Sequence, residues 1–144
     1  MTDSFNLQRF IDAQNPVFET VTAELASGKK RTHWMWFIFP QLEGLGRSET
    51  ARLYAIGSVA EARAYLDHAI LGDRLRVLTA LVNGLEGRSV EQIFGYPDDL
   101  KFHSSMTLFA HSARDKNPFE DAINRYFGGE PDRGTVERLR GAVD

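Results

Sequence analysis

The segment Asp98 to Ala113, DDLKFHSSMTLFAHSA, has the apolar spacing of an amphipathic helix. Phe102, Met106, Phe109 and Ala113 recur at intervals of three or four residues and therefore lie on one face of a helix. Sustained alternation of apolar and polar residues, the pattern of a half-buried strand, is hard to find in the chain. The segment and its surroundings therefore predict a helical fold.

Capping signals divide the rest of the chain into further short helices. Ser58 and Ser89 each precede a helical pattern, and Ser58 is followed three residues later by Glu61, the spacing of a capping box. Asn117 stands before a proline, which suits the first position of a helix, and Thr135 is placed to cap a last helix. These signals predict a mainly α, compact single-domain bundle of about six to eight short helices.

One apolar run, Trp34 to Phe39, fits either a buried strand or a buried helix. Thr32 as an N-cap and Pro40 as a stop leave about two helical turns between them, and we favour a helix. Both tryptophans of the chain fall in this run, and the strongest positive run, Lys29 to Arg31, comes immediately before it. This neighbourhood of aromatic and basic residues is the main functional signal.

Length and composition describe an ordinary globular domain. The 144 residues contain 17 Lys and Arg against 20 Asp and Glu, a formal net charge of -3, and 42% of them are hydrophobic. We expect one domain over residues 1–144, with its core at about 5–140. The absence of cysteine excludes disulfides and thiolate sites and favours a reducing cytoplasm. No apolar run is long enough to span a membrane, and the negative charge argues against broad nucleic-acid binding.

The basic and aromatic run has two interpretations. A helix that starts near Thr32 would place free backbone amides beside three cations, which suits a phosphate or carboxylate, and a tryptophan face suits a base. Alternatively, Lys29 to Arg31 is a solvated turn that leads into a core helix. The indole N–H of a buried Trp34 needs a partner, and this need favours a position at a pocket edge.

Two further segments carry candidate chemistry. The glycines of Gly44 to Ser48 can bring backbone amides near an anion, although the spacing matches no phosphate-binding loop. On a helix, Asp98, Lys101 and Ser105 share one side, which can border a pocket. The spacing of the four histidines matches no metal motif, and we expect neither a metal nor a cofactor.

Several of these segments resemble the family called domain of unknown function 1810 (DUF1810). They include KKRTHWMWFIFPQ at 29–41, GLGRS at 44–48, EARAYLDH at 61–68 and DDLK at 98–101. The resemblance is collinear from about Phe5 to Leu139 and implies a mainly helical bacterial domain. Members are often labelled calpastatin, but this capped, aromatic and unrepeated chain does not fit that disordered inhibitor. The pattern is also similar to small helical domains associated with NAD and ADP-ribose metabolism.

Together the residues and the resemblance predict a pocket for a small anionic, nucleotide-like ligand related to ADP-ribose or NAD. The alternative is a non-enzymatic protein-interaction module with a protein partner. Catalysis stays open, with His33 and Asp98 as acid or base candidates. The predicted ligand-binding residues are Lys30, His33, Trp34, Trp36, Gln41, Gly44, Gly46, Ser48, Lys101 and Ser105.

Overall fold

Ten α-helices form the described part of the chain, residues 3–141 of a computed structural model. They are α1 (Gln8–Gln14), α2 (Phe18–Ala26), α3 (Met35–Ile38), α4 (Glu49–Leu53), α5 (Val59–Asp67), α6 (Leu71–Asn83), α7 (Val90–Phe94), α8 (Asp98–Ser112), α9 (Pro118–Phe127) and α10 (Arg133–Gly141). The prediction of a mainly α bundle is confirmed. The number of helices exceeds the expected six to eight because α3, α4 and α7 have only four or five residues each. None of the described helices is both long and apolar enough to cross a membrane.

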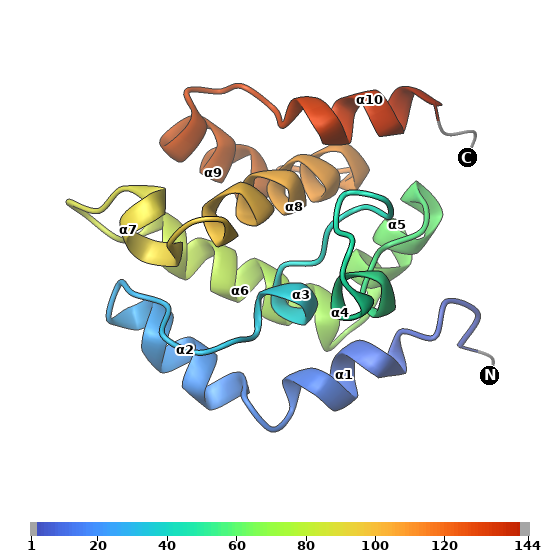
Figure 1. Cartoon of the computed structure of the whole chain (residues 1–144), viewed down its shortest axis with the longest axis horizontal. Coiled ribbons are helices and arrows are strands. Elements are labelled where there is room, and N and C mark those ends of the chain that lie inside the picture. The colour runs from blue at the N-terminus through green and yellow to red at the C-terminus, as the bar shows by residue number, and fades with distance from the viewer. Residues whose placement is uncertain (1–2, 142–144) are drawn as a thin grey trace.

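Helix α8 lies at the centre of the fold (Figure 1). It packs against α5, α7, α9 and α10, while α6 packs against α2, α5 and α9. The face predicted from the sequence is the buried one, because Phe102, Met106 and Phe109 are all fully inaccessible to solvent. These side chains join one hydrophobic core to which α1, α2, α3, α5 and α6 also contribute. Burial of this face drives α8 into the centre of the molecule.

Local capping follows the sequence at α5, α7 and α9 and departs from it at α10 and at α3. The side chains of Ser58, Ser89 and Asn117 accept backbone N–H groups at the starts of α5, α7 and α9, as predicted. Thr135, predicted as a cap, instead lies inside α10. Asp132 caps this helix, because its carboxylate accepts both the backbone N–H and the hydroxyl of Thr135. A carboxylate is the stronger acceptor of the two side chains at this position.

The run Trp34 to Phe39 contains one turn of helix, α3, so the helical alternative is correct and the strand is not. The helix is shorter than the two turns that we predicted. Thr32 is not its N-cap, because the Thr32 hydroxyl donates to Glu24 and Trp34 takes the capping position without a side-chain hydrogen bond. Met35 and Ile38 point into the core.

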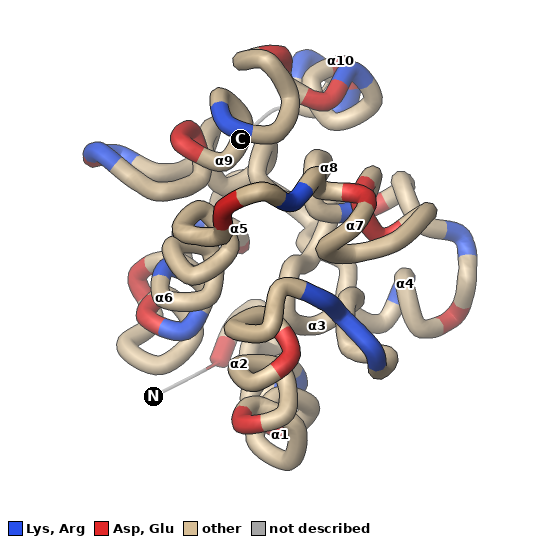
Figure 2. The backbone as a smooth tube through the Cα atoms, turned by 90° about the vertical axis from the view of Figure 1, so that its left-hand side faces the viewer, with Lys and Arg blue, Asp and Glu red and all other residues tan. Residues whose placement is uncertain are grey.

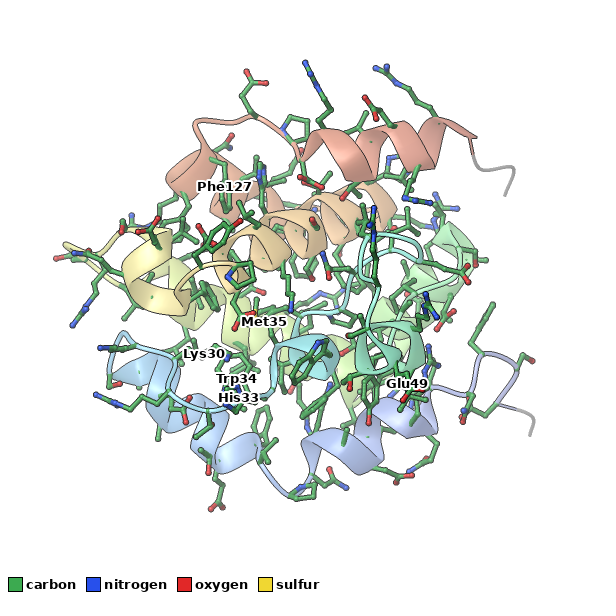
Figure 3. The ribbon with its side chains drawn as sticks, viewed as in Figure 1. Lys30, His33, Trp34, Met35, Glu49 and Phe127 are labelled. Carbon is green, nitrogen blue, oxygen red and sulfur yellow. The ribbon has the colours of Figure 1, made fainter. Side chains whose placement is uncertain are left out.

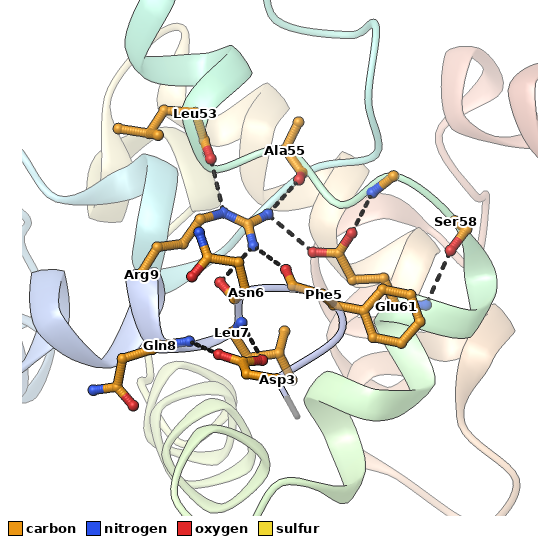
Figure 4. A network of polar contacts seen from close by, with 11 residues as sticks. Asp3, Phe5, Asn6, Leu7, Gln8, Arg9, Leu53, Ala55, Ser58 and Glu61 are labelled. Atoms are coloured by element: carbon orange, nitrogen blue, oxygen red, sulfur yellow. Dashed lines mark hydrogen bonds and ion pairs between the residues drawn. The ribbon is translucent and has the colours of Figure 1, made fainter. Parts of the chain in front are cut away.

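Arg9 ties the N-terminal helix to the connection between α4 and α5 (Figure 4). Its guanidinium donates to the carbonyls of Leu53 and Ala55, each at 2.8 Å, and forms an ion pair with Glu61 at 2.9 Å. The same group donates to two carbonyls of the segment before α1. Arg9 therefore fixes the position of α1, against which α3 packs.

Candidate functional site

The buried carboxylate of Glu24, on α2, accepts hydrogen bonds from the end of the run Lys29 to Arg31 and from the residues after it. We call this part of the connection between α2 and α3 the basic turn. Its carboxylate accepts the backbone N–H of Arg31 at 2.7 Å and of Thr32 at 3.1 Å, together with the Thr32 hydroxyl at 2.6 Å. A fourth donor is the indole N–H of Trp34, at 3.0 Å. The buried indole therefore has its partner inside the protein, and Trp34 is only 1% exposed.

The pKa of Glu24 reflects this set of donors. Burial raises it, but the hydrogen bonds from the Thr32 side chain, from the backbone of Arg31 and Thr32, and from Trp34 outweigh the burial and lower it to about 2. Glu24 is therefore ionised at neutral pH in a buried position, 6% exposed. The charge holds the connection between α2 and α3 in one conformation.

Two lysines meet at Asp98, the first residue of α8. The ammonium of Lys30 lies 2.9 Å from one carboxylate oxygen and that of Lys101 lies 3.6 Å from the other. This contact joins the basic turn to the first turn of α8. Because two ammonium groups share one carboxylate, the three side chains together retain one positive charge.

Each of these lysines also lies over a tryptophan. The Lys30 ammonium is 5.1 Å from the ring centre of Trp34, and the Lys101 ammonium is 5.3 Å from that of Trp36. The two pairs differ in access to solvent, since the Lys30 side chain is 6% exposed and the Lys101 side chain 26%. Trp34 is buried, whereas Trp36 is partly exposed. We call Lys30, Trp36, Asp98 and Lys101 the basic–aromatic cluster, in which Trp36 and Lys101 form the accessible part.

Ser105 lies one helical turn after Lys101 on α8. It is fully buried, and its hydroxyl has no hydrogen-bond partner within residues 3–141. A buried hydroxyl without a partner costs about 1–3 kcal/mol relative to a bonded one. Ser105 lines none of the cavities described below, and an enclosed water molecule is the partner that such a buried hydroxyl commonly has.

The glycine loop follows α3 and folds back on itself. A parallel bridge pairs Leu42 with Ile56, and Ser48 caps α4 by accepting the Ala51 N–H at 3.1 Å. A side chain at Gly46 would meet the Cβ of Ala51 at 2.5 Å, so this position needs glycine for close packing against α4. The side-chain oxygen of Gln41 lies on the same side, 3.8 Å from that position.

Arg138 of α10 covers Gly44, a contact that sequence reasoning missed. Gly44 has a φ of +93°, and any side chain there would collide with the Arg138 guanidinium. Arg138 is exposed and belongs to none of the ion pairs formed within residues 3–141. No local pattern could have identified it, because the contact depends on how α10 packs. The loop therefore has a cation beside it that the sequence does not indicate.

The structure thus places seven of the ten predicted ligand-binding residues in two groups. Lys30, Trp34, Trp36 and Lys101 meet around Asp98, whereas Gly44 to Ser48 lies against α4 and α10. Figure 2 shows the basic run on the connection between α2 and α3, and Figure 3 shows that Lys30, His33 and Trp34 lie together there.

The acid or base candidates differ in their surroundings. His33 is exposed, and its ring forms no hydrogen bond or ion pair within the described part of the chain. Both carboxylate oxygens of Asp98 face ammonium groups, those of Lys30 and Lys101. Within residues 3–141, no three acidic or histidine side chains are placed to hold a metal ion.

One cavity borders the basic run, and a larger one lies elsewhere in the fold. Lys30 lines one of about 320 Å³, together with Lys29, Arg88 and the segment 91–95. A larger cavity, of about 500 Å³, lies between α8, α9 and α10. None of the predicted ligand-binding residues lines the larger cavity.

Comparisons with known proteins place the chain in a family without an assigned activity. The family described as "Protein of unknown function (DUF1810)" matches residues 4–139. The chain is also similar to the conserved hypothetical protein Rv1873 from Mycobacterium tuberculosis, whose crystal structure has 54% sequence identity and a TM-score of 0.94. That match covers 96% of this chain and 99% of the other. No protein with a curated description gives a significant match.

Proposed function

We propose, from the premise that the chain belongs to the DUF1810 family, that it binds a small anionic, nucleotide-like ligand at the basic–aromatic cluster. The family description gives no activity, so the proposal rests on the chemistry of the site. The observation that carries it is the excess positive charge beside the partly exposed ring of Trp36.

The charges of the cluster favour a small anion over a neutral ligand. Asp98 compensates one of its two lysine partners, and Lys101 is both the more distant of the two and the more exposed. An anionic group that approaches Lys101 gains a charge-assisted hydrogen bond without breaking the shorter contact between Lys30 and Asp98. Phosphate and carboxylate groups are the acceptors that such a lysine binds.

Trp36 adds a feature that a nucleotide can use, because its ring is partly exposed. A base or a ribose can lie against the indole of Trp36, since aromatic faces bind the faces of bases by stacking. A phosphorylated ribose derivative, such as ADP-ribose or NAD, combines an anionic group with a base and matches these features.

The test is a calorimetric titration with ligands that lack one part at a time. ADP-ribose, NAD and AMP carry both phosphate and base, adenosine lacks the phosphate, and ribose 5-phosphate lacks the base. We expect Lys101→Met to weaken the phosphorylated ligands about tenfold and to leave adenosine unchanged. Lys116→Met is the matched control, because Lys116 is an exposed lysine in the connection between α8 and α9. Equal affinities for the two variants, or no binding across the panel, would refute the proposal.

Turnover of the bound ligand is a second step of this proposal. Asp98 lies within the cluster, and His33 lies on the same connection as Lys30. With one of these side chains as acid or base, the protein would act as a hydrolase or transferase on the bound phosphorylated ribose. Chromatography of ADP-ribose after incubation with the wild type, His33→Ala and Asp98→Asn distinguishes an enzyme from a binding protein.

A protein partner is the second function that a specific observation favours. Tyr96 is 77% exposed and Leu100 is 51% exposed, and both stand close in sequence to Asp98 and Lys101. Exposed apolar residues beside charged ones are typical of protein interfaces. If the chain is an interaction module, Lys30→Ala and Lys101→Ala will abolish the capture of a partner while no small ligand binds.

A further inference from the structure

The cavity between α8, α9 and α10 is separate from the basic–aromatic cluster. Its volume of about 500 Å³ lies within the range of small-molecule sites. Figure 1 shows the three helices together in the upper half of the molecule, with the turn between α9 and α10 beside them. None of the residues of the basic–aromatic cluster lines it.

Apolar side chains from all three helices form much of the wall. Ala110 comes from α8, Ile123 from α9, and Val136 and Leu139 from α10. Val136 and Leu139 are partly exposed, so the cavity leaves apolar surface of α10 in contact with solvent. An apolar group that fills the cavity would remove that surface from water.

Opposite charges face the same cavity. Glu120 lies in the first turn of α9 and Arg140 in the last turn of α10, and both line it. Neither forms an ion pair with any residue of the described range 3–141. His111 and Asn124 also line the cavity, and their side chains form no hydrogen bond within that range. Within residues 3–141, the cavity thus presents an acidic group and a basic group that form no ion pair.

We propose that this cavity binds a small zwitterion with an apolar body, the chemistry of an apolar amino acid. The carboxylate of the ligand binds Arg140, its ammonium group binds Glu120, and its apolar side chain lies against Ile123, Val136 and Leu139. A ligand with a single charge would form an ion pair with only one of Glu120 and Arg140. A zwitterion satisfies both, so charge complementarity selects it over a simple acid or amine.

The experiment uses three probes that share one aromatic body. L-phenylalanine carries both charges, phenylacetate carries only the carboxylate, and phenethylamine carries only the ammonium group. We expect L-phenylalanine to bind the full chain about tenfold more tightly than either of the others. Equal affinities for the three probes, or no binding up to their solubility limits, would overturn the proposal.

Two charge variants assign the two contacts. Glu120→Gln should reduce the affinity for L-phenylalanine to that for phenylacetate, and Arg140→Gln should reduce it to that for phenethylamine. Asp121→Asn and Arg52→Gln are the matched controls, since both residues are exposed and lie outside the cavity. If the controls lower the affinity as much as the cavity variants do, the selectivity does not arise in this cavity and the proposal fails.

The position of the probe is measured independently of the variants. Addition of L-phenylalanine should shift the backbone NMR signals of Ala110, Ile123 and Val136. The variant Lys101→Met should leave its affinity unchanged, so the outcome is independent of the proposed nucleotide site. Shifts confined to other parts of the chain would contradict the assignment.

Discussion

The substitution Glu24→Gln tests how the basic turn is held. It keeps the size of the side chain and removes the charge that four donors, from Arg31, Thr32 and Trp34, surround. The amide also replaces one acceptor oxygen with a donor, so at least one of these contacts is lost. The free energy of unfolding is therefore expected to fall, and the fall is expected to depend on pH.

The magnitude follows from the pKa of Glu24. Burial raises it, but the hydrogen bonds from Thr32, Arg31 and Trp34 lower it from 4.5 to about 2. At about 1.4 kcal/mol per pH unit, the charged form contributes about 3 kcal/mol to the free energy of unfolding. Because the folded state has the lower pKa, this contribution is complete above pH 4.5 and is lost as the pH falls towards about 2.

The assay is urea unfolding of the wild type and the variant from pH 7 to pH 2, followed by tryptophan fluorescence. We expect Glu24→Gln to be about 3 kcal/mol less stable at pH 7 and the two curves to converge near pH 2. Glu19→Gln is the control, because Glu19 is an exposed residue of the same helix without such contacts. The reasoning fails if the wild type and Glu24→Gln lose equal stability between pH 5 and pH 2.

Substitutions at three further positions test other contacts of the fold. Arg9→Met removes the partner of Glu61 and should lower the free energy of unfolding by about 3 kcal/mol, with faster hydrogen exchange in α1 as the local measure. Gly44→Ala places a side chain at a φ of +93° against Arg138 and should cost about 1 kcal/mol or more in urea unfolding. Ser58→Ala removes the cap of α5 and should cost about 1 kcal/mol, whereas Ser58→Gly should cost only a few tenths; thermal unfolding of the two variants measures the difference.

Contacts between near neighbours in the sequence were the predictable part of the fold. Ser58, Ser89 and Asn117 cap their helices as predicted, because each of these contacts spans two or three residues. The buried face of α8 was also predictable, since a helical period depends only on spacing along one element. Thr135 failed as a cap because a stronger acceptor, Asp132, stands three residues before it.

Contacts between elements were only partly predictable. The need of the Trp34 indole for a partner follows from burial, and by itself it predicts a position at a pocket edge. The partner is Glu24, an acidic residue between the buried positions Val21 and Leu25 of α2. An acidic residue within an apolar helical face, followed by a basic run, is a signal that could have found this contact. The contact of Arg138 with Gly44 has no comparable signal, because it depends on the placement of α10.

The contacts of the run Lys29 to Arg31 limit the kinds of ligand that the basic–aromatic cluster can bind. Lys30 forms its ion pair with Asp98, and Arg31 gives only its backbone N–H to Glu24, while the side chains of Lys29 and Arg31 stay exposed. The accessible charge of the cluster is instead at Lys101, on a helix that the sequence places far from the run. One accessible cation beside one aromatic ring suits a ligand with a single anionic group at that point, whereas a polyanion needs a row of cations. The two proposals can be tested separately. The zwitterion site uses Glu120 and Arg140, and Lys101 does not line that cavity.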